Sequence, residues 1–197
     1  MIASTRMLAG ALRWLVLTGA SVVLAACGGG GGEPAPVAGM GTVRVALTDA
    51  PSCKIGNDDL TKVSVTVERV RIHESGDDMP MSGRWYDLDV NPPRKINLLD
   101  LTNGRLEELG TLPIPAGTYT QVRLVLRPNV GNAIANSVVL AGQTAEIPLR
   151  TPSAAQSGLK IIRPFTVAPN ALADLVIDFD ACRSIVALGN GGFLLKP

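Results

Sequence analysis

Two carboxylates near the end of the chain are the first side chains whose spacing could do chemistry. Asp178 and Asp180 alternate with Ile177 and Phe179, so on a strand both carboxylates project from the face opposite the apolar one. Like charges this close repel, and a bound cation removes the repulsion. Together with Asp49 they predict an oxygen-ligand site of the kind that Ca²⁺ prefers, and no other cofactor is expected. The alternative is a solvated sheet face on which Asp180 accepts hydrogen bonds from turn amides.

A second candidate site surrounds Trp85 and Tyr86, which precede Asp87 and Asp89. An exposed aromatic ring beside carboxylates is suited to stacking on a sugar. In a sandwich, a tryptophan next to a tyrosine usually has one ring in the core and the other outside, and we expect Trp85 to be the buried one. Tyr86, Asp87 and Asp89 are therefore the candidate ligand-binding residues.

Residues for nucleophilic catalysis are missing from the sequence pattern. The single histidine, His73, stands beside Glu74 and belongs to no recognisable serine or cysteine motif. We therefore expect a protein that is not an enzyme. A hydrolase that acts on glycans through two carboxylates stays open as an alternative, because their separation in space is invisible in a sequence.

The beginning of the chain has the layout of a secretory signal. Arg6 and Arg13 precede an apolar run, 14–24, which is shorter than the roughly 20 residues that a membrane-spanning helix needs. Leu24-Ala25-Ala26-Cys27 resembles the lipobox of bacterial lipoproteins. That resemblance implies that residues 1–26 are removed and that the sulfur of Cys27 carries a diacylglycerol. Several acyl chains on one cysteine anchor a protein permanently to a membrane.

The segment after Cys27 predicts a flexible tether over residues 27–40. It contains five consecutive glycines, 28–32, followed by a proline-rich stretch that has little apolar surface to bury. Gly28 stands where an aspartate would signal retention in the inner membrane, so the outer membrane is expected, on its periplasmic face or at the cell surface. Without residues 1–26 the chain has 16 basic and 17 acidic residues, and this balance argues against nucleic acid as a partner.

Two cysteines remain in the exported part of the chain. Cys53 and Cys182 form an even pair in an oxidising compartment, which predicts a disulfide bond between them. Two free thiols or half of a metal site are the alternatives, but the chain has no Cys-x-x-Cys motif.

The remaining residues, 41–197, alternate between apolar and polar side chains with the two-residue period of strands. Gly, Pro and Asn separate these segments, which predicts an all-β domain: an antiparallel β-sandwich, immunoglobulin-like or transthyretin-like, with about 8 to 10 strands and little helix. The expected strands are 42–49, 61–73, 84–90, 95–101, 119–127, 137–140, 145–149, 159–167, 173–180 and 192–195.

Three local features refine this expectation. The alternation of Val63, Val65 and Val67 changes phase at 68–69, which predicts a β-bulge there. Residues 91–93, Asn-Pro-Pro, should break a strand, and 115–119, Pro-Ala-Gly-Thr-Tyr, should form the turn of a hairpin. Tyr119 is expected to bond the backbone near this turn through its hydroxyl.

Several segments of the body resemble the DUF4382 family of bacterial envelope lipoproteins: 47–51 (LTDAP), 96–101 (INLLDL) with Asn103-Gly104, 112–119 with 121–124, and 178–181 (DFDA). The resemblance implies architecture and location and no known activity. The segment 115–119 alone also resembles the hairpin of transthyretin-like and carboxypeptidase-regulatory-like sandwiches, some of which bind carbohydrate.

These observations predict an envelope lipoprotein that is anchored to the membrane through lipid. Its sandwich is expected to bind or scaffold a polysaccharide or a protein of the envelope. The alternative is a structural or assembly element that binds no small ligand.

Overall fold

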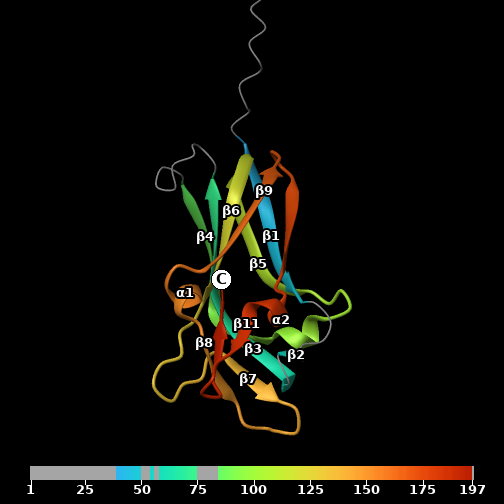
Figure 1. The fold of residues 1–197 in the computed structure, drawn as a ribbon. Helices are drawn as coiled ribbons and strands as arrows, with labels where there is room; N and C mark the ends of the chain where they lie inside the picture. Colours follow the sequence, from blue (N-terminus) through green and yellow to red (C-terminus); the bar gives the residue numbers. More distant parts are fainter. Residues whose placement is uncertain (1–38, 50–53, 56–57, 75–83, 197) are drawn as a thin grey trace, which may run out of the picture. The chain divides into compact units, whose positions relative to one another are not determined.

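The computed structural model describes residues 39–49, 54–55, 58–74 and 84–196, which lie in one compact unit, residues 36–197 (Figure 1). The strands are β1 Met40–Thr48, β2 Lys54–Ile55, β3 Asp58–Glu74, β4 Trp85–Asn97, β5 Glu107–Pro115, β6 Gly117–Leu126, β7 Ser137–Leu140, β8 Ile147–Arg150, β9 Leu159–Val167, β10 Leu172–Asp178, β11 Ile185–Ala187 and β12 Phe193–Leu195. The helices are short: the 3-10 helix η1 Leu98–Leu101, α1 Pro152–Gln156 and α2 Ala181–Ser184.

The strands form two sheets, which confirms the predicted all-β sandwich. The small sheet has the order β10-β1-β5, and the large sheet has the order β11-β12-β8-β7-β3-β6-β9, with β2 and β4 also paired to β3. Most neighbours are antiparallel, as expected. Two pairs, β1 with β10 and β12 with β8, are parallel, so the sheets are mixed.

The long strand β3 organises the large sheet. One of its edges pairs with β4 from Ser64 to His73. The other edge pairs first with β7, up to Ser64, and then with β6, from Val67 onward. We call the point where β7 and β6 separate from β3, around Thr66, the fork of β3. A strand edge that loses one partner before it gains the next leaves backbone groups to be satisfied in another way.

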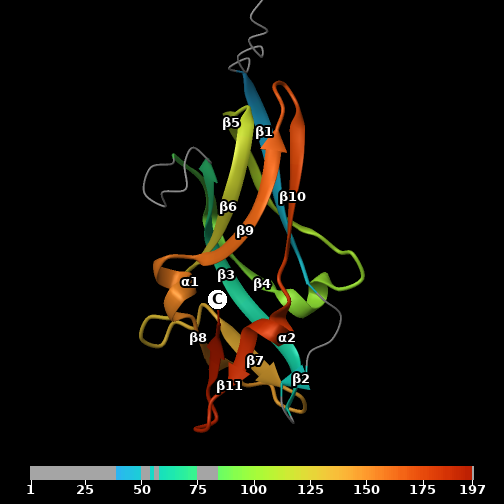
Figure 2. The same ribbon diagram turned by 45° about the horizontal axis from the view of Figure 1, so that its top comes forward.

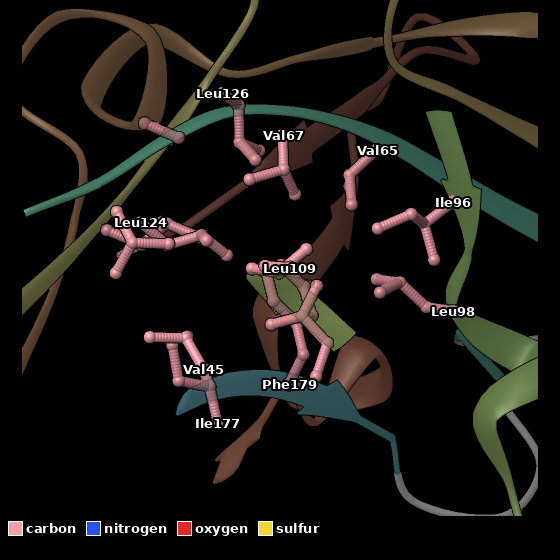
Figure 3. Close-up of a cluster of buried hydrophobic side chains, with 14 of the residues drawn as sticks. Val45, Val65, Val67, Ile96, Leu98, Leu109, Leu124, Leu126, Ile177 and Phe179 are labelled. Atoms are coloured by element: carbon pink, nitrogen blue, oxygen red, sulfur yellow. The ribbon is translucent and has the colours of Figure 1, made fainter. Parts of the chain in front are cut away.

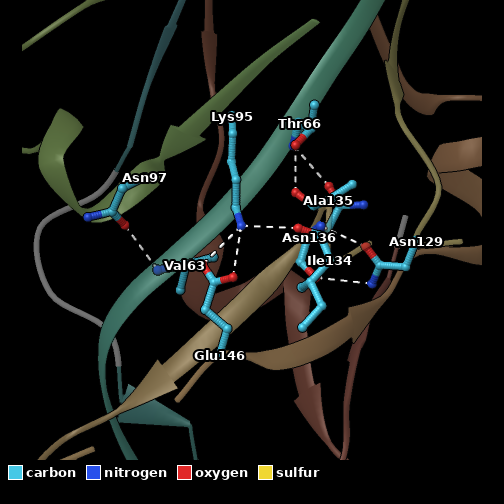
Figure 4. Close-up of polar contacts among 9 residues, drawn as sticks. All are labelled: Val63, Thr66, Lys95, Asn97, Asn129, Ile134, Ala135, Asn136 and Glu146. Atoms are coloured by element: carbon cyan, nitrogen blue, oxygen red, sulfur yellow. Dashed lines mark hydrogen bonds and ion pairs between the residues drawn. The ribbon is translucent and has the colours of Figure 1, made fainter. Parts of the chain in front are cut away.

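The buried side chain of Asn136 satisfies these groups (Figure 4). Its Oδ1 accepts a hydrogen bond from the backbone N–H of Thr66 at 2.9 Å, and its Nδ2 donates to the carbonyl oxygen of Arg127 at 2.7 Å. Asn129 holds Asn136 in turn: its Oδ1 accepts from the Asn136 N–H at 2.7 Å, and its Nδ2 donates to the Asn136 carbonyl at 3.0 Å. Two side-chain amides thus replace the missing length of strand.

Much of the core lies between the small sheet and the part of the large sheet around β3 and β6 (Figure 3), and buried side chains of β7, β8, β11 and β12 also belong to it. Val45, Leu109 and Ile177 come from the small sheet, and Val65 and Leu124 face them from the large one. Burying one such side chain stabilises the fold by roughly 1.5 to 3 kcal/mol, whereas an exposed ion pair contributes about 0 to 1 kcal/mol. Apolar packing between the sheets therefore contributes far more than the surface charges.

Two local predictions are confirmed. The register of β3 shifts between Val67 and Arg69 against both β4 and β6, at the predicted bulge. The hydroxyl of Tyr119, a fully buried residue, donates to the carbonyl oxygen of Pro115 at 2.6 Å. Burial raises the pKa of this hydroxyl to about 12, so it stays protonated and able to donate.

Three other local predictions are wrong. Residues 91–93 do not end a strand: β4 continues through them, because β4 pairs only with β3 and its other edge tolerates proline. The end of the expected strand 95–101 is the 3-10 helix η1. The turn at 115–119 connects β5 of the small sheet to β6 of the large sheet, and therefore forms no hairpin.

The network at the fork predicts a large loss of stability for Asn136→Ala. The substitution removes the partner of the buried Thr66 N–H and of the partly buried Arg127 carbonyl, so the free energy of unfolding should fall by roughly 2 to 4 kcal/mol. Urea unfolding measures this change. Gln143→Ala, on the exposed turn after β7, is the control and should change stability by less than about 0.5 kcal/mol. Equal effects of the two variants would contradict this role for Asn136.

The ion pair of Lys95 with Glu146 predicts a dependence of stability on pH. Lys95 Nζ lies 2.9 Å and 3.0 Å from the two carboxylate oxygens, and its hydrogen bond lowers the pKa of Glu146 below its ordinary 4.5. The contribution of this carboxylate is therefore complete above pH 4.5 and is lost as the pH falls through the lower folded-state pKa. The stability difference between the wild type and Glu146→Gln should shrink over that range in urea titrations. Glu108 is an exposed carboxylate, so the stability difference between the wild type and Glu108→Gln should stay small at every pH.

Candidate functional site

The outer face of the large sheet carries a regular array of polar and aromatic side chains on β4, β3, β6 and β9. Apolar and polar residues alternate along these strands, so the side chains opposite the core fall into rows across the sheet. The register defines three rows, which we call the outer face: Trp85, His73, Gln121 and Ile162; Asp87, Arg71, Arg123 and Lys160; and Asp89, Arg69 and Val125.

Trp85 is the centre of this face. The guanidinium carbon of Arg71 lies 4.8 Å from the centre of the indole ring, and that of Arg123 lies 4.7 Å from it. Cations at this distance are attracted by the ring quadrupole, by about 0.5 to 1 kcal/mol each at exposed sites. The indole therefore holds two guanidinium groups in place on a solvent-facing surface.

His73 lies next to Trp85 on the neighbouring strand. The centres of the two rings are 4.6 Å apart with their planes tilted by 50°. The histidine is only 7% exposed, and its Nε2 has no hydrogen-bond partner among the residues that the structure describes. A buried polar atom without a partner costs about 1 to 3 kcal/mol, so the sheet keeps His73 in an unfavourable position under the aromatic ring.

Four of the charges on the outer face neutralise one another. Arg71 Nε lies 2.8 Å from an oxygen of Asp87, and Arg69 Nε lies 2.6 Å from an oxygen of Asp89. Arg69 also reaches Asp87 at 3.6 Å. The hydrogen bond to Asp89 raises the pKa of the Arg69 guanidinium further above its ordinary value. Two of the candidate residues, Asp87 and Asp89, thus hold arginines in position.

Arg123 is different, because among the described residues it has no carboxylate partner. Its Nη1 lies 3.4 Å from the carbonyl oxygen of Ser157, and the amide oxygen of Gln121, turned toward it, accepts from its Nε at 2.6 Å. Neutral acceptors orient the guanidinium without cancelling its charge. Lys160, beside Arg123 in the same row, also lacks a carboxylate partner within the described ranges.

The positions of Trp85 and Tyr86 are the reverse of those expected. Tyr86 packs against the core, with its ring edge-on to Tyr119 at 5.9 Å, and its hydroxyl donates to Glu74 at 3.0 Å. Burial is the main reason that the pKa of Tyr86 is raised. Of the candidate ligand-binding residues, Asp87 and Asp89 lie on the outer face and Tyr86 does not.

The candidate calcium ligands bond mainly to backbone amides. Asp49 is 5% exposed, and its Oδ1 accepts from the N–H of Ala181 at 3.0 Å. Asp180 lies beyond the end of β10, where it accepts from the N–H of Arg183 at 3.1 Å and caps α2. Asp178 is exposed at the end of β10. In the part of the chain that the structure describes, no group of three or more His, Cys, Asp or Glu side chains is placed to hold a metal ion.

A family model described as a domain of unknown function, DUF4382, matches residues 40–197. The chain belongs to the DUF4382 family. Comparison with curated proteins gave no match, and comparison with solved structures gave none either.

Three of the segments that resemble DUF4382 meet at one corner of the domain. Leu47 and Thr48 end β1, residues 96–101 end in η1, and residues 178–181 lead from β10 into α2. The N–H of Phe179 donates to the carbonyl of Thr48 at 2.9 Å, and the hydroxyl of Thr48 donates to the carbonyl of Leu101 at 3.3 Å. These DUF4382 segments therefore form a structural junction. The segment 121–124 is different, since it supplies Arg123 to the outer face.

Other sequence predictions lie outside the described residues. They include Cys27 with the signal and most of the tether, and Cys53, so the disulfide bond to Cys182 stays a prediction. Cys182 itself lies in α2 and packs against the core. Among the described residues, no helix is long and apolar enough to cross a membrane.

Sequence reasoning missed Arg71, Arg123 and His73 as members of the candidate site. The alternation of side chains does indicate the face of two of them. Arg71 and His73 stand two residues apart in β3 and therefore share one face of the strand, while the buried Val70 and Ile72 share the other. The pattern of one strand does not show which other strands lie beside it, so the grouping of these residues could not be predicted.

Proposed function

We propose that this DUF4382 chain is a lipid-anchored envelope protein whose sandwich binds an acidic polysaccharide without chemical conversion. The observation that carries the proposal is the outer face, where Trp85 holds the guanidinium groups of Arg71 and Arg123. The ligand-binding surface is then Trp85, Arg71 and Arg123, with His73 packed beneath Trp85 and with Asp87 and Asp89 as positioning residues.

The acidic character of the ligand follows from the charges of this face. Arg71 already bonds Asp87, but Arg123 presents a full positive charge that only neutral acceptors orient. A guanidinium matches the planar geometry of a carboxylate and forms two parallel hydrogen bonds with it. The carboxylates of uronic acid residues are therefore the groups that this face fits best.

A polymer suits the shape of the surface better than a small molecule does. Two of the rows cross four neighbouring strands and the third crosses three of them. Neighbouring strands are about 4.8 Å apart, so the face is broad and not enclosed. Small ligands usually bind in concave sites that bury most of their surface. A chain of sugars gains its affinity from several weak contacts along such a face.

Attachment through Cys27 places this face in the envelope, where polysaccharides are found. The lipobox-like residues 24–27 and the basic, then apolar, leader support lipidation. The exported chain carries a net charge near −1, so a long-range field does not attract the acidic ligand. Binding depends instead on the local cations of the outer face.

The hydrolase alternative requires two carboxylates about 5 to 10 Å apart around a bound sugar. The groove between β9 and β10 contains Asp174 and Asp178, but these residues are four positions apart on one strand, which separates their backbones by about 13 Å. Asp174 is also paired with Arg44 at 2.7 Å. Asp87 and Asp89 stand closer, two positions apart on β4, but each binds an arginine. The geometry of these two carboxylate pairs favours binding over hydrolysis.

Polygalacturonate, a polymer of uronic acids, should bind the purified full-length chain more tightly than dextran, a neutral glucan. Arg123→Gln should weaken polygalacturonate binding at least about tenfold, because a hydrogen bond to a charged group contributes roughly 1.5 to 3 kcal/mol. Trp85→Ala should weaken it similarly by releasing both guanidinium groups. Isothermal titration calorimetry measures the affinities, and melting curves check that each variant is folded.

Arg105→Gln is the matched control, since Arg105 is exposed and lies outside the outer face. Its affinity for polygalacturonate should equal that of the wild type. Equal binding of the two polymers, or an unchanged affinity of Arg123→Gln, would show that the outer face does not recognise acidic sugars.

The anchor is tested in cells. Cys27→Ser should release the protein from the membrane fraction and abolish labelling by an alkyne fatty acid, because the sulfur that carries the diacylglycerol is gone. Gly30→Ala, in the tether, should fractionate and label like the wild type. Membrane attachment of Cys27→Ser equal to that of the wild type would rule out lipidation at this residue.

A further inference from the structure

Two consecutive strands of this domain do not pair with each other. β9 ends at Val167 and β10 begins at Leu172, a connection short enough for a hairpin. Among the described strands, however, β9 pairs only with β6, in the large sheet, and β10 only with β1, in the small sheet. Figures 1 and 2 show the two strands separating from their connection toward α1 and α2. Each strand therefore has an edge without a strand partner.

The space between the two edges is an apolar groove of about 360 Å³. Its apolar lining comes from Val122, Ile161, Phe165, Leu175 and Ile177. An unpaired strand edge beside apolar side chains is a template for a further strand.

Exposed apolar side chains concentrate on the same two strands. Ile162 on β9 is 70% exposed, and Leu172 and Val176 on β10 are 54% and 47% exposed. They account for three of the six large apolar side chains exposed in the described part of the chain. Ile162 lies on the outer face of the large sheet and Val176 on the solvent face of the small sheet, so each strand carries exposed apolar side chains beside its open edge.

The charges of the two strands are opposite. β9 carries Lys160 and Arg163, and β10 carries Asp174 and Asp178. Within the described residues, Lys160, Arg163 and Asp178 have no ion-pair partner, whereas Asp174 is paired with Arg44. A surface that carries both signs on adjacent edges is complementary to its own copy.

We propose that a second copy of this chain docks along these edges, with β9 of each copy antiparallel to β10 of the other. A twofold axis parallel to the strands produces both pairings at once, so that the large sheet of one copy continues into the small sheet of the other. The register that places Ile162 opposite the second copy's Val176 also places Lys160 opposite the second copy's Asp178. Apolar side chains then meet apolar ones, and opposite charges meet, twice in each dimer.

The proposal is tested by cysteine crosslinking of full-length protein in intact cells. Two differently tagged copies are expressed together, one with Ile162→Cys and the other with Val176→Cys, and are treated with a short bismaleimide. A product that carries both tags is expected. Val130→Cys in place of Val176→Cys is the matched control, because Val130 is an exposed apolar residue outside both strands, and its yield should be at least about fivefold lower.

Charge exchange tests the register. Lys160→Asp should lower the yield of the product carrying both tags several-fold by placing two carboxylates opposite each other, and Lys160→Asp combined with Asp178→Lys should restore it. The proposal is overturned by the absence of a product carrying both tags, by a yield equal to that of the Val130→Cys control, or by crosslinking of Ile162→Cys to a different protein.

Discussion

The two-sheet architecture depends on the way in which one strand, β3, exchanges partners along a single edge. β7 pairs with its first part and β6 with its last part, so on this edge Thr66 lies between the two partners, whereas on the other edge it pairs with Lys95 of β4. Buried N–H and C=O groups must be satisfied, and here the side chain of Asn136 satisfies them by donating and accepting at once. An amide carries its acceptor and its donor on two separate atoms, so Asn136 reaches both groups at once.

The exchange at Asn136 divides the large sheet into two parts with different roles. β6 and β9 extend the part that faces the small sheet, where the core lies and where the outer face carries Trp85 and Arg123. β7, β8, β12 and β11 extend the other part, beyond the fork. The bulge at residue 68 lies next to the fork, where it adds to the twist of β3. β9 is the last strand of the first part.

The alternation of apolar and polar side chains was sufficient to predict most of the strands, because side chains two residues apart in a strand face the same side of the sheet and are buried or exposed together. The bounds of β9 agree with the prediction to the residue. Asn136 was not predicted to have a role, since an isolated asparagine between strands is typical of any turn. The parallel pairing of β1 with β10 was not predicted either, because a sequence of alternating strands carries no record of which strands become neighbours.

Trp85 was predicted to be buried because sandwiches usually bury a tryptophan, although the alternation of its neighbours indicates the opposite face. Leu88 and Val90 share the face of Tyr86, whereas Asp87 and Asp89 share the face of Trp85.

The two carboxylates beside Trp85 explain why a nearly neutral protein can present a defined cationic site. Had Arg69 and Arg71 been unpaired, four cations on neighbouring strands would repel one another and weaken the sheet. Asp87 and Asp89 cancel two of these charges and fix the positions of both arginines, and the indole of Trp85 holds Arg71 and Arg123 at one ring. The two charges that remain are those of Arg123 and Lys160, which stand side by side and act over short distances. Screening in salt confines exposed charges to a range of about 8 Å, so a ligand must already lie on the outer face before these cations contribute to its binding. Recognition by this domain then depends on contact geometry, and the rows of the sheet fix that geometry.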